Sequence, residues 1–114
     1  TPETRGMFDN AFFAAIKEGA YFINIGRGES VITSALTAAL TAGRVGGAGL
    51  DVTEPEPLPP DHALWSMENV IITPHIATSS DFRGDRTVTL VVENVRRYVR
   101  GDKLLSVVDL AQGY

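Results

Sequence analysis

Three short apolar segments recur at a regular spacing, and that spacing restricts the folds open to the chain. They are Tyr21–Ile25, Val45–Val52 and Val70–Thr73. Each has the length of a strand, and the first connection has room for a helix. A strand, a helix and a further strand in this order form a β-α-β unit, whose strands are parallel and whose crossover is right-handed. The sequence therefore predicts an α/β fold built on a parallel sheet.

Capping residues and apolar spacing predict a helix before the first strand and another after it. Asp9 or Asn10 caps the earlier helix, which covers Ala11–Glu18 and ends at Gly19.

In the later helix, a hydroxyl side chain provides the cap at Thr33 or Ser34, and Gly43 ends the helix. Its expected buried stripe is Leu36, Ala39 and Leu40.

The second half of the chain begins with a proline-rich region. Four prolines within residues 53–61 predict a rigid loop rather than a helix. We expect Leu64 and Trp65 to anchor the end of this loop in the core. A long helix then follows from Ser80 to Arg100, and Gly101 ends it. Its expected inward face consists of valines at helical spacing: Val88, Val91, Val92, Val95 and Val99.

The segment Leu104–Val108 has the composition of a short strand and no obvious partner strand in the sequence.

Charge and composition argue against several classes of function. The formal net charge is −4, and the densest basic run, Arg96, Arg97 and Arg100, lies on the predicted long helix, where it reads as a solvated face. We therefore expect no nucleic-acid partner. No apolar stretch approaches the roughly 20 residues needed to cross a bilayer, so no membrane partner is expected. The absence of cysteine fits a reducing compartment, and a cytoplasmic location is expected. No metal site is expected.

A side chain capable of chemistry stands at or just past the end of each strand segment: Arg27, Asp51 and His75. Neighbouring parallel strands lie about 4.8 Å apart, so residues just past their ends converge on one edge of the sheet. Ligands of open α/β sheets bind at this carboxyl edge. A guanidinium, a carboxylate and an imidazole at the same edge indicate an active site.

An alternative interpretation treats the first of these turns as a dinucleotide-binding loop. Gly26-Arg27-Gly28 follows a strand and precedes a helix, and Asp51 ends the next strand, which nearly matches the G-x-G-x-x-G fingerprint and its downstream acid. In that case Asp51 would hold a ribose. However, valine stands where the fingerprint requires its third glycine, and the helix begins too late.

Four motifs in order resemble the D-isomer-specific 2-hydroxyacid dehydrogenases, over nearly the whole chain. They are Thr1-Pro2-Glu3-Thr4-Arg5-Gly6, Ile23-Asn24-Ile25-Gly26-Arg27-Gly28, Gly49-Leu50-Asp51-Val52-x-x-x-Glu56-Pro57 and Asn69-Val70-x-x-Thr73-Pro74-His75. The resemblance implies part of a doubly wound, Rossmann-like nucleotide-binding domain. It places the C-terminal half of that domain at residues 1–100 and a tail returning to a substrate domain at residues 101–114, with this chain a piece of a larger protein.

The resemblance also implies roles for individual residues. Arg27 would bind the carboxylate and carbonyl of the substrate, Asp51 would hold the nicotinamide side of the cofactor, and Glu56 with His75 would form the acid–base pair. The implied cofactor is NAD, with NADP not excluded. The positions implied to contact it are Ile25, Gly26, Arg27, Asp51, His75 and Ala77.

The implied activity is hydride transfer between NAD(P) and a D-2-hydroxy acid or 2-keto acid. Glutamate at position 56 favours lactate-, glyoxylate-, hydroxypyruvate- or phosphoglycerate-type substrates over formate. The sequence Ile76-Ala77-Thr78 departs from the small, glycine-containing sequence that often follows the histidine. The full-length protein is expected to be a homodimer, and the isolated chain to be inactive. A protein that senses NAD(H) or acts as a corepressor on the same fold stays open as an alternative.

Overall fold

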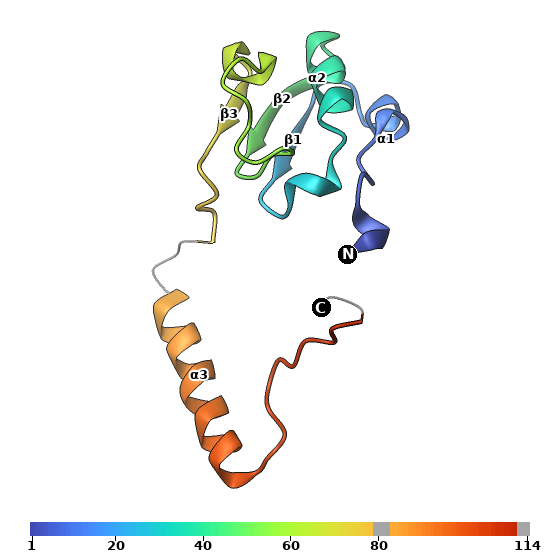
Figure 1. Ribbon diagram of the computed structural model, residues 1–114. Coiled ribbons are helices and arrows are strands. Elements are labelled where there is room, and N and C mark those ends of the chain that lie inside the picture. Colours follow the sequence, from blue (N-terminus) through green and yellow to red (C-terminus); the bar gives the residue numbers. More distant parts are fainter. Residues whose placement is uncertain (79–82, 112–114) are drawn as a thin grey trace. The chain divides into compact units, whose positions relative to one another are not determined.

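A computed structural model describes residues 1–78 and 83–111. The backbone forms two units (Figure 1). The N-terminal unit is Pro2–Ala77, and the C-terminal unit is Thr78–Tyr114 together with Thr1. No helix among the described residues is long and apolar enough to span a membrane.

The N-terminal unit is built on a three-stranded sheet in the order β1-β2-β3, and all of its strands are parallel. The strands are Ala20–Asn24, Val45–Leu50 and Val70–Ile72. This arrangement confirms the predicted α/β fold. Each strand ends slightly earlier than the sequence suggests. In β1 the reason is local, because the side chain of Asn24 accepts the N–H of Gly26 and begins a turn.

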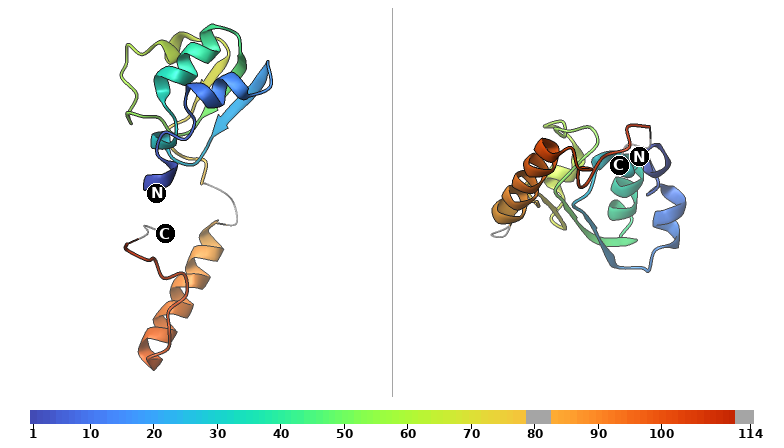
Figure 2. Two further views of the ribbon diagram at one scale, coloured as in Figure 1. Left: turned by 90° about the vertical axis from the view of Figure 1, so that its right-hand side faces the viewer. Right: turned by 90° about the horizontal axis from the view of Figure 1, so that it is seen from below.

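Two helices, α1 (Asn10–Ala15) and α2 (Thr33–Thr41), lie against one face of the sheet (Figure 2). Alternate burial along β1 agrees with this layering. Phe22 faces the helices and is buried, whereas Tyr21 and Ile23 point to the other face and are 77% and 70% exposed. The sheet therefore has one covered face and one open apolar face within this unit.

The first helix ends at Ala15 rather than at the predicted Glu18. The backbone of Ile16 is already extended. The guanidinium of Arg44 donates to the carbonyl oxygens of Ala14 and Ile16, so a side chain from just before β2 caps the C-terminal end of α1.

The helix caps follow the sequence in one case and depart from it in the other. Asp9 caps α1, because its carboxylate accepts a backbone N–H of the first turn. In α2 the N-cap position is Ile32, which offers no side-chain acceptor, so the prediction of Thr33 or Ser34 as the cap was wrong. Thr33 lies within the helix, and its hydroxyl donates to the carbonyl oxygen of Glu54 in the proline-rich loop.

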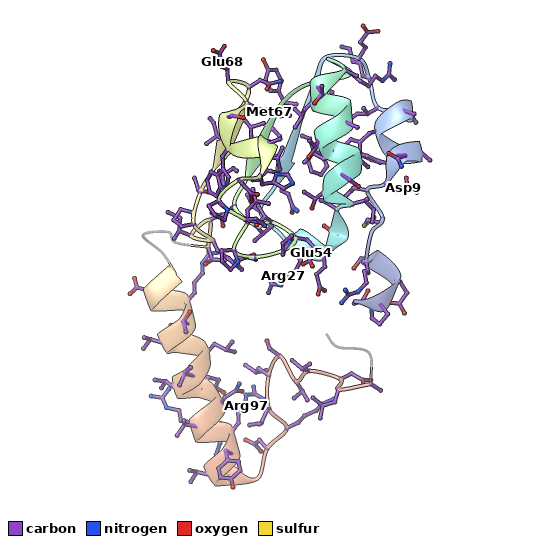
Figure 3. All side chains as sticks on the ribbon, turned by 45° about the horizontal axis from the view of Figure 1, so that its top comes forward. Asp9, Arg27, Glu54, Met67, Glu68 and Arg97 are labelled. Atoms are coloured by element: carbon purple, nitrogen blue, oxygen red, sulfur yellow. The ribbon has the colours of Figure 1, made fainter. Side chains whose placement is uncertain are left out.

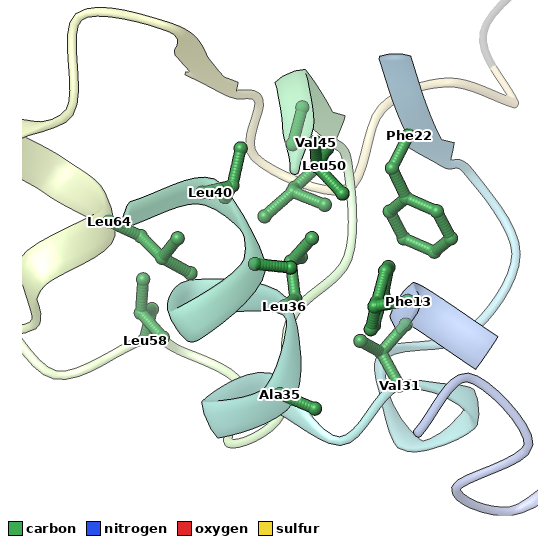
Figure 4. Close-up of a cluster of buried hydrophobic side chains, with 12 residues drawn as sticks. Phe13, Phe22, Val31, Ala35, Leu36, Leu40, Val45, Leu50, Leu58 and Leu64 are labelled. Carbon is green, nitrogen blue, oxygen red and sulfur yellow. The ribbon is translucent and has the colours of Figure 1, made fainter. Parts of the chain in front are cut away.

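The core lies between the helices and the covered face of the sheet (Figure 4). Phe13 contacts Phe12 and Phe22 in edge-to-face arrangements. Leu36 of α2 and Leu64 are almost completely buried, and the core also receives Val31, Ala35, Ala39, Leu40, Val45, Ala48, Leu50 and Leu58.

The proline-rich loop is attached to this core by Leu64, as predicted, but not by Trp65. Leu64 is 1% exposed and lies in a 3-10 helix, η3 (Ala63–Ser66), between the loop and β3. Trp65 is 52% exposed, and its indole N–H donates to the carbonyl oxygen of Pro59. The indole therefore closes the loop from outside instead of entering the core.

The C-terminal unit contains α3 (Arg83–Arg100), which Gly101 ends with a positive φ of 74°. The predicted start at Ser80 lies outside the described residues. The expected inward face is wrong within this unit, because its valines are exposed: Val88, Val91, Val92, Val95 and Val99.

The tail after α3 contains no strand within its described residues, so the strand-like composition of Leu104–Val108 does not produce one. The tail instead returns along α3. Asn94 binds both backbone groups of Leu105, and the guanidinium of Arg97 donates to the carbonyl oxygen of Lys103.

Candidate active site

The carboxyl ends of the three strands meet at one edge of the N-terminal unit. Asn24, Leu50 and Ile72 are paired across the sheet. The pairing continues one residue further, since the N–H of Asp51 donates to Asn24 and the N–H of Thr73 donates to Leu50. Because the strand spacing is about 4.8 Å, the residues that follow β1 and β3 begin about 10 Å apart. Arg27, Asp51 and His75 follow the ends of β1, β2 and β3 at this edge.

Asn24 builds the turn that presents Arg27. Its buried side-chain amide accepts the N–H of Gly26 at 3.0 Å and donates to the carbonyl oxygen of Arg27 at 3.0 Å. Arg27 itself is exposed, and its Nη1 donates to the carbonyl oxygen of Gly26 at 2.8 Å. A guanidinium has five N–H donors, so most of them stay available to a ligand.

Gly28 allows this turn to lie directly against the proline-rich loop. A Cβ atom at Gly28 would lie 1.9 Å from the carbonyl oxygen of Thr53, a distance that no side chain tolerates. The close approach joins the segment after β1 to the loop that carries Glu54 and Glu56. Figure 3 shows Arg27 and Glu54 at the same end of the unit, opposite Met67 and Glu68.

Glu56 and His75, the residues predicted as an acid–base pair, are in direct contact. The Nδ1 atom of His75 lies 2.6 Å from Oε1 of Glu56. The two side chains are 43% and 42% exposed, so both are accessible to a ligand while they hold each other. With Nδ1 occupied by the glutamate, Nε2 is the ring nitrogen left to face a substrate.

The backbone of His75 is in the left-handed region, with φ at 56°. Histidine adopts this region more often than most residues, but the conformation still costs of order 1–3 kcal/mol and persists only where neighbouring groups hold it. The hydrogen bonds of Asp51 satisfy that condition. Its Oδ1 accepts the hydroxyl of Thr73 at 2.6 Å and the N–H of Ile76 at 2.9 Å, and its Oδ2 accepts the N–H of Ala77 at 2.8 Å.

These contacts determine the charge state of Asp51, which is buried at the end of the central strand. Burial alone would raise the pKa of its carboxyl group. The three hydrogen bonds act in the opposite direction and, with the nearby imidazole, hold the pKa of Asp51 below its ordinary value. Asp51 is therefore a carboxylate at neutral pH.

A pocket of about 620 Å³ opens beside the Glu56–His75 pair. Its size is typical of small-molecule sites. Both polar and apolar side chains line the pocket. The lining residues are Asp51, Thr53, Glu56, Pro57, Leu58, Trp65, Ile72, Thr73, Pro74 and His75.

The structure thus brings Glu56 and His75 into direct contact and joins Asp51 to the segment that includes Ala77. Arg27, with Ile25 and Gly26, lies in the turn after β1 at the same edge. The described residues contain no cluster of three His, Cys, Asp or Glu side chains suited to a metal ion.

Two polar residues of the site, Asn24 and Thr73, were not predicted as functional from the sequence. Asn24 is part of an apolar strand, and Thr73 reads as the last residue of another. A buried asparagine before a Gly-x-Gly turn is a usable signal, because an amide can satisfy both a backbone donor and a backbone acceptor. The partner of Thr73 is 22 residues away, so no local pattern identifies it.

Comparison with known proteins gives a family for this arrangement. Residues 1–77 match the model of the D-isomer specific 2-hydroxyacid dehydrogenase, NAD binding domain. A solved D-isomer specific 2-hydroxyacid dehydrogenase from Xanthobacter autotrophicus Py2, in complex with NADPH and MES, is 45% identical. The match covers all of this chain and 46% of the Xanthobacter chain, with a TM-score of 0.90.

Two further structures support the match. An NADPH-dependent glyoxylate/hydroxypyruvate reductase from Sinorhizobium meliloti, in complex with NADP and sulfate, is 44% identical over the whole chain and 37% of its own, with a TM-score of 0.88. A D-lactate dehydrogenase with NAD⁺ from Lactobacillus jensenii is 30% identical over 96% of this chain and 37% of its own, with a TM-score of 0.82. The chain spans less than half the length of each of these proteins. It belongs to the D-isomer specific 2-hydroxyacid dehydrogenases, and its N-terminal unit has the Rossmann-like fold of their NAD-binding domain.

Proposed function

We propose that the natural full-length polypeptide containing this chain transfers a hydride between NAD(P) and a D-2-hydroxy acid or its 2-keto acid. The observation that carries the proposal is the 2.6 Å contact between Glu56 and His75 at the sheet edge that also carries Arg27. Similar proteins are named as reductases of glyoxylate and hydroxypyruvate and as a dehydrogenase of D-lactate, which are all 2-keto or 2-hydroxy acids.

The strand ends fit the nicotinamide part of such a cofactor. Asp51 accepts three hydrogen bonds, and a carboxylate has about four acceptor positions, so Oδ2 retains one for an amide donor. Ile25 is 62% exposed beside Gly26, and Ala77 is also exposed. These residues, with Arg27 and His75, would hold the cofactor, which when bound supplies or accepts the hydride.

In this proposal Arg27 binds the carboxylate of the substrate. Its guanidinium is fixed at one side by the carbonyl oxygen of Gly26 and presents its remaining donors to solvent. A planar fork of donors matches a carboxylate through two parallel hydrogen bonds and keeps its charge at every relevant pH. The same guanidinium also stabilises negative charge on the carbonyl oxygen during reduction.

His75 moves the proton. During reduction its Nε2 gives a proton to the carbonyl oxygen of the keto acid, and during oxidation Nε2 takes the proton from the hydroxyl group. Glu56 contacts Nδ1 and fixes the ring, which leaves Nε2 to exchange the proton. An imidazole can both give and take a proton, as the two directions of the reaction require.

The proposal is tested with the full-length polypeptide, NADH or NADPH, and a panel of 2-keto acids that includes glyoxylate, hydroxypyruvate and pyruvate. We expect turnover in the unaltered protein and a fall of about 10²–10⁴-fold in kcat for His75→Ala, because general acid catalysis contributes this much. The dissociation constant of the cofactor should change little.

His62→Ala is the matched control. The imidazole of His62 accepts the N–H of Leu64 at 3.3 Å and is not among the residues that line the pocket beside Glu56 and His75, so its removal should leave kcat near normal. Near-normal turnover by His75→Ala would remove the catalytic assignment. A full-length protein that binds the cofactor and turns over none of the acids would favour the sensing or corepressor function.

A further inference from the structure

The carboxylate of Asp51 is occupied by the segment that carries His75. It accepts the hydroxyl of Thr73 at 2.6 Å, two residues before His75. It also accepts the backbone N–H groups of Ile76 and Ala77 at 2.9 and 2.8 Å, directly after His75. The three partners therefore lie on both sides of the dipeptide Pro74-His75, and Asp51 itself is buried just past the end of the central strand.

The backbone of His75 depends on these contacts. With φ at 56°, the chain turns at His75 so that two successive N–H groups point toward the same carboxylate. On the other side, the N–H of His75 donates to the carbonyl oxygen of Thr73 at 3.0 Å, which makes a tight turn. Hydrogen bonds therefore hold the backbone of residues 75–77, from which the imidazole projects.

We propose that Asp51 and Thr73 are positioning residues that hold His75 in its reactive orientation against Glu56. The inference rests on the proposed function and adds a role to the cofactor contact expected of Asp51. Hydrogen bonds to a carboxylate are stronger than those between neutral groups, so three of them hold the segment firmly. An error of about 1 Å in the position of a reacting group lowers a rate by about 100-fold.

The two roles of Asp51 predict different results. If Asp51 acts only on the cofactor, the hydroxyl of Thr73 has no part in the reaction, and the backbone after His75 does not depend on the carboxylate. If Asp51 acts through His75, removing either Asp51 or the hydroxyl loosens residues 75–77 and lowers turnover. Thr73 is therefore the more informative position, because it changes the hydrogen bonding and leaves the charge of Asp51 in place.

The test uses Asp51→Asn, Thr73→Val and Thr73→Ser in the full-length polypeptide. We expect kcat/KM for the preferred keto acid to fall about 100-fold in Asp51→Asn. It should fall about tenfold in Thr73→Val, which loses one hydrogen bond to a charged group. Thr73→Ser keeps the hydroxyl and should recover most of that loss. In Thr73→Val the dissociation constant of NAD(P)H should stay within about twofold of the unaltered value, since the carboxylate charge is retained.

Amide hydrogen exchange provides a readout that does not need activity. The N–H groups of Ile76 and Ala77 should exchange faster in Asp51→Asn and in Thr73→Val than in the unaltered protein, and Thr73→Ser should restore protection. Normal turnover and normal exchange in Thr73→Val would overturn the proposal. Weaker cofactor binding by Asp51→Asn, with unchanged exchange at residues 76–77, would also overturn it.

Two further outcomes separate a failure of the proposed function from a failure of the positioning role. If the unaltered protein reduces none of the acids, the proposed function fails, while exchange still decides whether Asp51 and Thr73 hold the segment around His75. If circular dichroism shows that Asp51→Asn does not fold, the comparison of Thr73→Val with Thr73→Ser decides the question by itself.

Discussion

Both units of this chain contain many apolar side chains. Several of these side chains are buried in the N-terminal unit, whereas those described in the C-terminal unit are exposed. In the N-terminal unit, Phe13, Leu36 and Leu64 are at most 2% exposed. In the C-terminal unit, no described residue of α3 or of the tail is buried, and Val95 and Val99 are 58% and 79% exposed. An amphipathic pattern identifies a face that can be buried, but only a second packed element provides the burial.

The same difference separates the hydrogen bonds of the two units. At the sheet edge the buried amide of Asn24 holds the turn after β1, and the buried carboxylate of Asp51 joins the segment after β3 to β2. In the C-terminal unit, Asn94 makes a comparable pair of bonds to Leu105, but in an exposed position. Hydrogen bonds fix geometry most firmly where water cannot compete for them. For this reason the N-terminal unit can hold a precise site.

The largest test of this comparison is the removal of one buried ring. Phe13→Ala should destabilise the chain by about 3–5 kcal/mol, because it loses buried apolar area and leaves a cavity beside Phe22. Val95→Ala on α3 should change stability by no more than about 0.5 kcal/mol. Chemical denaturation monitored by circular dichroism measures both. Equal losses for the two variants would show that the C-terminal unit is as tightly packed as the N-terminal one.

A pair of glycines gives the next largest contrast, with opposite signs. Gly28→Ala places a Cβ atom against the carbonyl oxygen of Thr53 and should cost about 1–3 kcal/mol. Gly84 lies in the first turn of α3, and a Cβ atom there meets nothing within 4 Å. Gly84→Ala should therefore stabilise α3 by up to about 1 kcal/mol through helix propensity.

Thermal unfolding and the helical signal at 222 nm measure these two changes. The comparison would be refuted at this level if Gly28→Ala were neutral, or if Gly84→Ala lowered the helical signal.

The smallest expected effect is a change in pH dependence. The pKa of Asp51 is lower in the folded chain than in the unfolded one, where the ordinary value is about 3.9. A depressed folded pKa means that Asp51 contributes stability above the unfolded pKa. That contribution is lost as the pH falls through the folded pKa. Between pH 6 and pH 2 the unaltered chain should therefore lose more stability than Asp51→Asn, as measured by urea denaturation at each pH.

The matched comparison is Asp102→Asn. Asp102 is an exposed residue of the C-terminal unit that pairs with Arg100. It should leave the acid profile nearly unchanged, because exposed ion pairs contribute little. Identical profiles for the unaltered chain and Asp51→Asn would contradict the role given to the Asp51 hydrogen bonds.

Local sequence patterns predicted most of the helices and strands but fewer of the residues at which they end. Apolar spacing identified all three strands, and Gly43 and Gly101 ended their helices with positive φ as expected. The end of α1 was missed because the guanidinium that caps it comes from Arg44, well beyond the helix. Trp65 was wrongly assigned to the core because two adjacent apolar residues look alike in sequence, although only Leu64 is buried.

The candidate site divides in a similar way. The sequence placed Arg27, Asp51 and His75 at one sheet edge because parallel strands have a fixed spacing and direction. It could not reveal that Asp51 accepts the hydroxyl of Thr73, since these residues follow two different strands and are 22 positions apart in the sequence.

The sequence by itself determined the α/β class, the order of the elements and the residue types that can carry chemistry, because each depends on short-range periodicity or on a motif. Only the tertiary structure decided which apolar faces are buried. It also decided that His75, after β3, adopts a left-handed backbone held by the carboxylate of Asp51, after β2. Those features depend on contacts between segments that are distant in sequence. Such contacts stabilise the protein only once folding has brought the segments together.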